Sequence, residues 1–327
     1  MNKRIYPLKF FPIFKEKVWG GRKLREIGKD LPENQKIGEI WELVDRPDSI
    51  SIVSNGYYAN KSFRKIICEL KDDLIGTDKK LDSFARFPLL IKYIDAAENL
   101  SVQVHPDDAM ALKFNENDPG KTEFWYIFDT QDNPKILCGC DPAIKNITDQ
   151  RQIGKNLDLF KFIDIQKGDL IFIPAGQVHA LLKGTVLLEI QENSDITYRF
   201  YDWDRIDESG NQRELHFDKA INAIKTELPS KLFQRVSDFK EGYSTILDSS
   251  YFKIDLLKTR NRFSSMCDGK SYKILIILDG YANFKYGTNY EESLFLKKTD
   301  IILLPASLGN FSIETSQCTE INAFFIS

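Results

Sequence analysis

Two stretches of the chain share one pattern: IDIQKGDLIFIPA at residues 163–175 and LFLKKTDIILLPA at residues 294–306. Each is an apolar-rich run, a turn that carries Lys and Asp, a second apolar run and then Pro-Ala. Short apolar runs bounded by turn residues are typical of β-strands with a buried face. The repeated pattern therefore predicts two related β-barrels within one chain.

The two copies differ in their histidines. Counted from the proline, His179 in the first copy corresponds to Asn310 in the second, and no histidine follows His216. Histidine is a common metal ligand and acid-base group. We therefore expect a catalytic domain at residues 1–240 and a structural domain without metal ligands at residues 241–327.

The rest of the chain fits a mainly β fold. Short β-rich runs are punctuated by Gly, Pro, Asn and Asp, as in antiparallel sandwiches and barrels. We predict strands at residues 88–95, 100–105, 123–128, 170–174, 186–191 and 198–203. Apolar residues at helical spacing, or a Pro-Asp-Asp start, predict helices at residues 62–73, 106–115 and 214–226.

Composition excludes several classes of partner. The net charge of −3, from 45 basic and 48 acidic residues among 327, gives no electrostatic reason to expect nucleic acid or an anionic membrane. We see no signal-peptide region and no apolar run long enough to cross a membrane. The five scattered cysteines predict reduced thiols in a cytoplasmic protein, not disulfides or a structural zinc site.

A metal site is predicted from four residues. Gln103 and His105 alternate with valines, so they are expected to share one face of a strand. Glu123 opens an aromatic strand, and His179 follows a buried strand and a turn. Two His and one Glu form a three-ligand zinc site with an open position, and the Gln103 carbonyl oxygen would be a fourth ligand.

That prediction has alternatives. An isolated histidine is more often a surface or hydrogen-bonded residue than a ligand, but the chain has only 3 histidines. Two His and one carboxylate also describe a non-haem iron site. His216 lies near a predicted helix start, and we expect it to be structural.

Three more residues are candidates for catalysis. Lys121 shares the face of Glu123 by alternation, and Glu189 lies on the polar face of its strand. Arg199 lies between aromatic residues, where a partly buried cation needs an anionic partner or ligand. The alternatives are a solvated edge-strand pair for Lys121 and Glu123, and a surface ion pair with a nearby aspartate for Arg199.

Taken together, several runs resemble the type I mannose-6-phosphate isomerases (phosphomannose isomerases) of the short bacterial class, in the cupin superfamily. The runs lie at residues 18–21, 38–42, 89–108, 120–126, 174–179 and 189–205, in the family's order. Each run alone is weak, but together they are specific. The resemblance implies two cupin-type (jelly-roll) β-barrels, with a few helices packed around the N-terminal catalytic barrel.

The resemblance also assigns residues. The family's zinc ligands match His105, Glu123 and His179, with Gln103 as a ligand in longer relatives, which implies one Zn²⁺ per chain. The family's catalytic arginine matches Arg199, and Lys121 and Glu189 match two further site positions. The chain departs from longer members, which carry His-Lys-Pro-Glu where it has GKTE at residues 120–123. It is also too short for their large helical insertion.

The implied reaction interconverts mannose 6-phosphate and fructose 6-phosphate by moving a proton between C2 and C1 through a cis-enediol. Zinc would polarise the sugar oxygens, Arg199 would stabilise enediolate charge or hold phosphate, and Lys121 and Glu189 would handle protons or bind hydroxyls. The expected partner is a small phosphosugar, and the expected oligomeric state is a monomer or weak homodimer. Two alternatives remain: a non-catalytic sugar-binding metal cupin, and an iron-dependent cupin dioxygenase.

Overall fold

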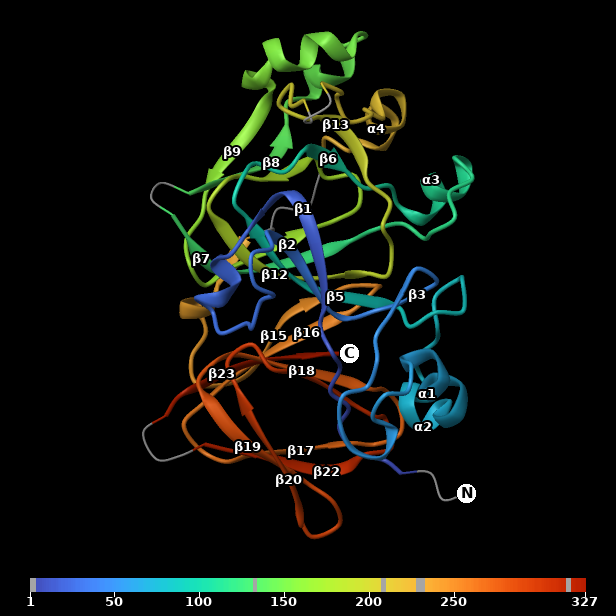
Figure 1. The fold of residues 1–327 in the computed structure, drawn as a ribbon, viewed down its shortest axis with the longest axis vertical. Helices are drawn as coiled ribbons and strands as arrows, with labels where there is room; N and C mark the ends of the chain where they lie inside the picture. Colours follow the sequence, from blue (N-terminus) through green and yellow to red (C-terminus); the bar gives the residue numbers. More distant parts are fainter. Residues whose placement is uncertain (1–3, 132–133, 207–209, 228–232, 316–318) are drawn as a thin grey trace.

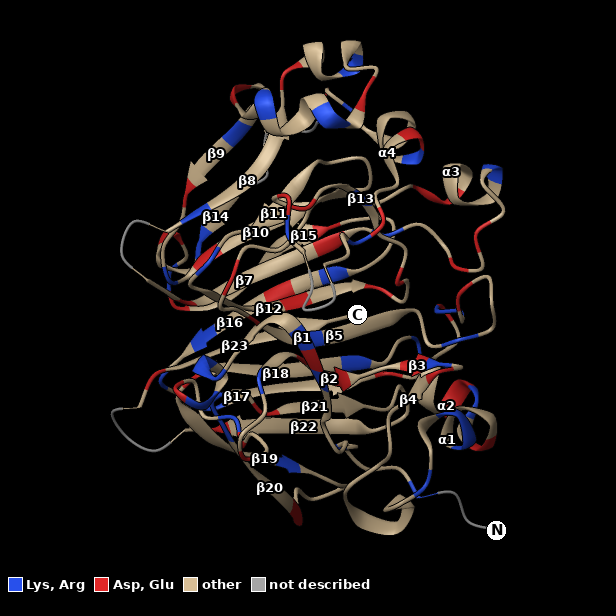
Figure 2. Ribbon diagram, turned by 45° about the horizontal axis from the view of Figure 1, so that its top comes forward, with Lys and Arg blue, Asp and Glu red and all other residues tan. Residues whose placement is uncertain are grey.

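Two pairs of antiparallel sheets make up most of the molecule, one pair above the other in Figure 1. The computed structural model describes residues 4–131, 134–206, 210–227, 233–315 and 319–327. Charged residues lie on several strands of the upper pair near the middle of the molecule, as Figure 2 shows. No helix in the described ranges is long and apolar enough to span a membrane.

The first pair consists of a seven-stranded and a five-stranded sheet. The seven-stranded sheet has the order β1 (Ile13–Gly21), β2 (Ile37–Leu43), β5 (Leu89–Ala96), β12 (Thr185–Glu192), β7 (Glu123–Thr130), β10 (Asp169–Ile173) and β14 (Phe233–Arg235). The five-stranded sheet has the order β13 (Tyr198–Tyr201), β6 (Val102–Val104), β11 (His179–Leu181), β8 (Lys135–Cys140) and β9 (Phe160–Asp164). A small hairpin joins β3 (Asp45–Arg46) to β4 (Ser49–Ile50).

The second pair consists of a five-stranded and a four-stranded sheet. The five-stranded sheet has the order β15 (Gly242–Asp248), β16 (Lys253–Thr259), β23 (Ile321–Ile326), β18 (Lys273–Asp279) and β21 (Ile301–Leu304). The four-stranded sheet has the order β17 (Phe263–Cys267), β22 (Gly309–Glu314), β19 (Tyr281–Tyr286) and β20 (Glu292–Lys297).

Strand pairing reproduces the repeat predicted from the sequence. In the first pair β10 joins β7, while β11 joins both β6 and β8. In the second pair β21 joins β18, while β22 joins both β17 and β19. Two related cupin-type units are thereby confirmed, each seen as a pair of facing sheets. The division at residue 240 remains a prediction, and it falls between β14 and β15.

Apolar residues fill three successive layers between the sheets. One core lies inside the first pair and includes Trp125 and Leu187, and another lies inside the second pair and includes Phe311. The largest core joins the seven-stranded sheet to the second pair, where Phe124 meets Phe324 with ring centroids 6.0 Å apart. The seven-stranded sheet is therefore buried on both faces, which explains why its strands are so apolar.

The three predicted helical regions are confirmed, with adjusted ends. They hold α1 (Phe63–Leu70), α2 (Asp72–Ile75), α3 (Asp108–Lys113) and α4 (Phe217–Ala223). Short 3₁₀ turns occur as η1 (Lys23–Arg25), η2 (Gly56–Tyr58), η3 (Pro142–Asn146), η4 (Gln150–Lys155), η5 (Leu157–Leu159) and η6 (Val236–Asp238).

The placement of α2 differs from the expectation that helices surround the N-terminal unit. The Tyr272 amide donates to the Ile75 carbonyl at 3.1 Å, and the Ala306 amide donates to the Leu74 carbonyl at 3.0 Å. These bonds satisfy carbonyls near the end of α2, which have no partner within the helix. The helix therefore binds the second sheet pair as well as the first.

Candidate active site

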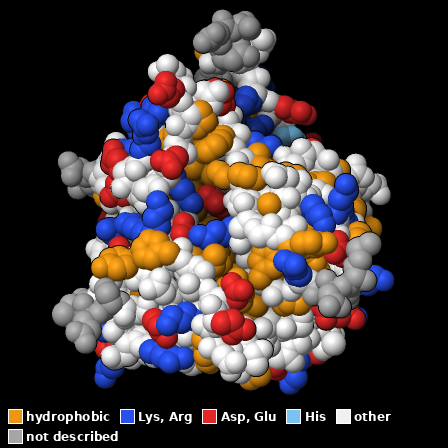
Figure 3. Space-filling view, turned by 60° about the horizontal axis from the view of Figure 1, so that its bottom comes forward, with side chains coloured by type: hydrophobic (Ala, Val, Ile, Leu, Met, Phe, Trp, Pro, Cys, Tyr) orange, Lys and Arg blue, Asp and Glu red, His pale blue; other side chains and the backbone are white. Residues whose placement is uncertain are grey.

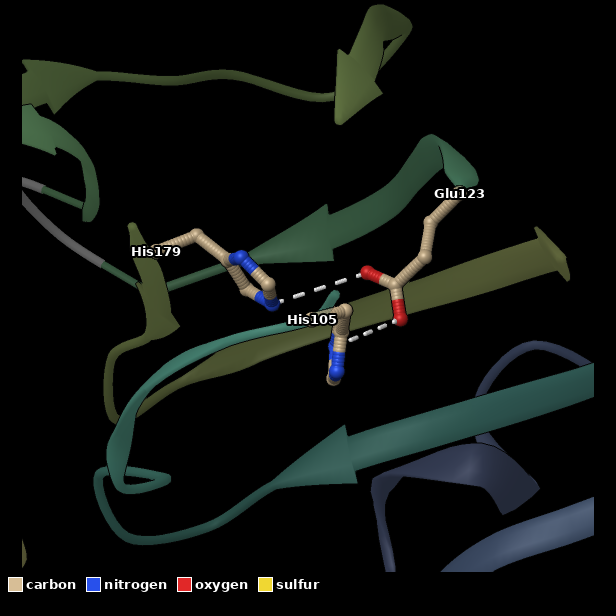
Figure 4. A group of neighbouring side chains, drawn as sticks. All are labelled: His105, Glu123 and His179. Atoms are coloured by element: carbon tan, nitrogen blue, oxygen red, sulfur yellow. Dashed lines mark ion pairs between the residues drawn. The ribbon is translucent and has the colours of Figure 1, made fainter. Parts of the chain in front are cut away.

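His105, Glu123 and His179 converge between the two sheets of the first pair (Figure 4). Glu123 opens β7 and His179 opens β11, while His105 directly follows β6. The Nε2 atom of His105 lies 3.2 Å from Glu123 Oε1, and that of His179 lies 3.6 Å from Glu123 Oε2. One ligand atom from each residue lies within 4.8 Å of the others, so a single ion can contact all three.

Hydrogen bonds set the orientation of both imidazoles. His105 donates from Nδ1 to the Ile196 carbonyl at 2.7 Å, and His179 donates from Nδ1 to the Gln177 carbonyl at 2.9 Å. Each neutral ring therefore presents an unprotonated Nε2 toward Glu123. Two lone pairs facing one carboxylate repel it unless a cation lies between them. A hydrogen bond from the second nitrogen to a carbonyl is the usual support of a metal-bound histidine.

The electrostatics of these three residues also suit a metal. Burial, reinforced by the Lys121 ammonium, lowers the pKa of His105 to about 3. Burial likewise lowers the pKa of His179. Burial alone would raise the pKa of Glu123, but Lys121 and the two imidazoles hold it well below its usual range. The set is thus two neutral imidazoles and one carboxylate, the protonation states that metal binding requires.

Gln103, the fourth predicted ligand, touches the same group. Its Nε2 lies 3.2 Å from His179 Nε2. A half-turn of the amide would bring the Gln103 oxygen to that position and leave the nitrogen facing the Ser101 hydroxyl, which now lies 3.4 Å from the oxygen. One detail of the sequence interpretation changes, because β6 ends at Val104, one residue before His105.

Cross-strand pairing arranges the site as facing rows of side chains. Across the five-stranded sheet, Gln103 pairs with Arg199 on one side and with His179 on the other. Across the seven-stranded sheet, Glu189 pairs with Lys92 on one side and with Trp125 on the other. Directly paired residues share a face of the sheet. Residues far apart in the chain therefore meet in the space between the two sheets.

That space contains a cavity of about 300 Å³. The predicted residues Gln103, Lys121, Glu189 and Arg199 all line it. Other charged or aromatic residues of its wall were not predicted from the sequence: Lys17, Trp19, Glu39, Lys92, Trp125 and Arg213. On the face of the molecule drawn in Figure 3, basic and acidic side chains are interspersed around a central hollow.

Lys121 is buried, contrary to the solvated alternative. Its side chain is only 5% exposed, and its Nζ lies 2.6 Å from Glu123 Oε1. Its backbone amide donates to the Pro106 carbonyl at 3.0 Å, which fixes the turn before β7. The ammonium therefore borders both the predicted ligand set and the cavity.

Glu189 is held by two donors. Its Oε1 lies 2.9 Å from Lys92 Nζ, and its Oε2 accepts a hydrogen bond from Trp125 Nε1 at 2.8 Å. Burial and the nearby Glu123 carboxylate raise the pKa of Glu189, against the effect of Lys92. Burial would lower the pKa of Lys92, but Glu189, Glu39 and Glu123 together raise it. The Lys92 side chain is therefore a buried ammonium.

Arg199 uses only part of its hydrogen-bonding capacity within the described residues. Its Nη1 donates to the Glu214 carbonyl at 2.7 Å, while its buried Nε has no hydrogen-bond partner among the described residues. Asp202, a partner that the surface alternative allowed, is occupied by Arg205 at 2.6 Å and by Arg213 at 2.5 Å. Burial and the Arg213 charge lower the pKa of Arg199. An arginine so placed at a cavity wall can bind an anionic group.

Gly120 shows why this chain departs from the His-Lys-Pro-Glu pattern. A Cβ atom built on Gly120 would lie 2.6 Å from the backbone of Asp107 and Asp108. The Gly120 amide also donates to Asp108 Oδ1 at 2.8 Å. A histidine at this position would require a different path for residues 106–108.

Lys92 is the clearest residue that sequence reasoning missed. It is the one basic residue of the mostly apolar strand LLIKYIDA, and its side chain is 7% exposed. A lone lysine within a strand buried on both faces is a usable signal, because an ammonium there needs an anionic partner.

Comparisons with known proteins agree with one another. Residues 8–126 match the family model described as phosphomannose isomerase type I, catalytic domain. The chain is 35% identical to a putative mannose-6-phosphate isomerase of Bacillus subtilis, over 96% of this chain and 97% of the relative. It is 35% identical to the mannose-6-phosphate isomerase ManA of that organism, over 94% and 96%. A crystal structure of mannose 6-phosphate isomerase from Bacillus subtilis superposes with a TM-score of 0.81 at 33% identity, covering 98% of this chain and 99% of that one.

Proposed function

Since the chain belongs to the type I phosphomannose isomerase family, we propose that it interconverts mannose 6-phosphate and fructose 6-phosphate. The observation that carries the proposal is the pair of unprotonated Nε2 atoms facing Glu123, beside a cavity that Lys121, Glu189 and Arg199 line. This arrangement combines a candidate metal-ligand set, groups that can carry protons and a guanidinium at the cavity wall.

The ligand set fits zinc, with one ion per chain. His105, Glu123 and His179 would hold the ion, and the Gln103 oxygen would complete the set. Nitrogen and carboxylate ligands suit Zn²⁺, and three protein ligands are usual for catalytic zinc. When bound, the ion would supply Lewis-acid polarisation of the sugar's carbonyl or hydroxyl oxygens.

The surrounding residues divide the remaining tasks. Isomerisation through a cis-enediol moves one proton between C2 and C1, so the site needs a positioned acid-base group. Lys121 and Glu189 line the cavity, and the orientation of Glu189 is held by Lys92 and Trp125. The Nε of Arg199, which has no partner among the described residues, could donate to an anionic group, either the phosphate or the developing enediolate.

The deciding experiment measures isomerase activity on mannose 6-phosphate in a coupled assay, before and after chelation. We expect chelation to abolish turnover and zinc to restore it. Stoichiometric iron with oxygen-dependent turnover would instead indicate a dioxygenase, and metal binding without turnover would indicate a sugar sensor.

Substitutions test the residues. His105→Ala should lower turnover at least about 100-fold, since even outer partners of metal ligands cost 10–100-fold. Arg199→Ala should lower it by about 100-fold or more, the cost of removing one donor to a developing oxyanion. His179→Ala has a matched control in Asn310→Ala, which occupies the corresponding place in the second unit and is exposed. If both His105→Ala and Arg199→Ala kept wild-type turnover, the assignment of the site would be wrong.

We also propose the cytoplasm as the place of action and a monomer or weak homodimer as the working form. Cys68, Cys138, Cys140 and Cys267 are free thiols. Burial raises the pKa of Cys138 to about 12 and that of Cys140 to about 11, so both stay protonated and unreactive. Sedimentation velocity at micromolar concentration would test the oligomeric state.

A further inference from the structure

Arg199 lies on an edge strand whose outer side is covered by a short irregular segment. Among the described strands, β13 pairs only with β6, and the register shifts between Arg199 and Tyr201. Strand pairing alone therefore leaves the outward-facing backbone N–H and C=O groups of this edge strand without partners. Residues 214–216 run along the open side and supply what a neighbouring strand would supply.

Three hydrogen bonds join that segment to Arg199. The His216 amide donates to the Arg199 carbonyl at 2.8 Å, and the Arg199 amide donates to the His216 ring at Nδ1, at 3.1 Å. The third bond runs from Arg199 Nη1 to the Glu214 carbonyl at 2.7 Å. The His216 ring thus replaces a backbone carbonyl as the acceptor for the Arg199 amide.

We propose that His216 is a positioning residue for Arg199, acting through the acceptor at its Nδ1. This inference rests on the proposed function, because it concerns where Arg199 presents its guanidinium to the cavity. His216 was expected to be structural, and the inference gives it a defined task. A small displacement of a positioned group costs catalysis far more than it costs folding.

The charges around His216 favour its role as an acceptor. It faces Arg199 on β13, Lys219 on α4, Glu214 on its own segment and Glu116 after α3. Burial, then Arg199, lowers the pKa of His216, so the ring is neutral near pH 7. A neutral ring that accepts at Nδ1 carries its proton on Nε2. This is the opposite tautomer to His105 and His179, both of which donate from Nδ1.

Two substitutions separate the acceptor from the ring. His216→Asn keeps an acceptor atom at the δ position and removes the ring. His216→Phe keeps a ring beside Tyr198, whose centroid lies 6.4 Å from that of His216, and removes the acceptor. Asn222→Ala is the control, because Asn222 is exposed on α4 and, within the described part of the chain, its side chain bonds only the Asp218 carbonyl.

We expect His216→Phe to lower kcat/KM for mannose 6-phosphate about 10-fold, the effect of one typical hydrogen bond. His216→Asn and Asn222→Ala should stay within about 2-fold of wild type. In an Arg199→Ala background, His216→Phe should change kcat/KM by less than about 2-fold, because there is no guanidinium left to position. The reverse order of the two His216 variants, or an equal loss in both backgrounds, would overturn the proposal.

A second measurement does not depend on turnover. With only 3 histidines, ¹⁵N spectra of the labelled protein should show one ring protonated at Nε2 and two at Nδ1. The Arg199 Nε resonance should broaden or shift in His216→Phe and stay unchanged in His216→Asn. An inactive wild-type enzyme would contradict the proposed function alone, whereas an unchanged Arg199 resonance in His216→Phe would contradict the positioning role.

Discussion

Replacing Lys92 with methionine tests how strongly burial controls an ion pair in this fold. Lys92 and Glu189 lie 2.9 Å apart with side chains only 7% and 4% exposed. A surface pair in the same molecule, Lys183 and Glu98, has the same 2.9 Å distance but side chains 56% and 58% exposed. The two pairs therefore differ in environment and not in separation.

The expected magnitudes follow from Coulomb's law. At 2.9 Å, two unit charges interact by about 6 kcal/mol at an effective dielectric constant of about 20, and by about 1.4 kcal/mol in bulk water. Desolvation offsets most of the buried pair's energy in the intact protein. Once one partner is removed, however, the other remains as an uncompensated buried charge, at a cost of about 3–5 kcal/mol. An exposed pair contributes about 0–1 kcal/mol.

The assay is urea denaturation at pH 7, followed by fluorescence and far-UV circular dichroism. We expect Lys92→Met to lower the free energy of unfolding by about 3–5 kcal/mol, and Lys183→Met to lower it by less than about 1 kcal/mol. Lys92→Met combined with Glu189→Gln should recover part of the loss, because no ionised Glu189 is then left without its partner.

Two results would refute this reasoning. One is a difference of less than about 1 kcal/mol between Lys92→Met and Lys183→Met, which would mean that water reaches Glu189 freely. The other is a double variant at least as unstable as Lys92→Met, which would mean that the lost stability comes from packing of the lysine stem.

Two further perturbations address the pH dependence and the core. Burial, then the Asp108 charge, raises the pKa of Glu192 to about 8, against about 4.3 in an unfolded chain. The folded state then binds more protons between these values, so stability falls as pH rises from about 4.3 to about 8. Glu192→Gln can still accept a hydrogen bond from the Thr122 amide, and it should lose less stability than wild type between pH 5 and pH 8. Free energies of unfolding from urea denaturation that fall equally with pH in both proteins would contradict this. Phe324→Ala, in the core between the two units, should lower the free energy of unfolding by about 3–5 kcal/mol. Phe295 is 58% exposed, so Phe295→Ala should change it by less than about 0.5 kcal/mol. Equal losses in the two variants would be inconsistent with that core.

Much of the fold could be predicted because alternate residues of the central strands face two different interiors, one on each side of the seven-stranded sheet. On β7, Phe124 and Tyr126 join the core toward the second unit, while Trp125 faces the interior of the first pair. On β12, Leu188 and Ile190 face that core, and Glu189 between them lines the cavity. A period of two along a strand was therefore enough to place Glu189 on the polar face of its strand, opposite Leu188 and Ile190.

The site features that could not be predicted depend on pairing between segments far apart in the chain. Lys92 becomes interpretable only when β5 is known to pair with β12 in a register that opposes it to Glu189. The task proposed for His216 depends on an edge strand that ends the sheet, which alternation does not reveal. The short turns η3, η4 and η5 have too few residues to show helical periodicity, so they were not predicted.

The repeat explains why the candidate site in the first unit has no counterpart among the described residues of the second. On the register of the paired strands, Glu123 opposes Ile173 in the first unit, and Lys273 opposes Leu304 in the second. An ammonium thus stands where the first unit has the Glu123 carboxylate. Asn310 is exposed, although His179 is buried, so this position of the second unit faces solvent instead of the interior. Both changes oppose metal binding without altering any strand pairing. The second unit instead contributes Phe324 and its neighbours to the core behind the seven-stranded sheet, and so holds in place the strands that carry Glu123 and Glu189.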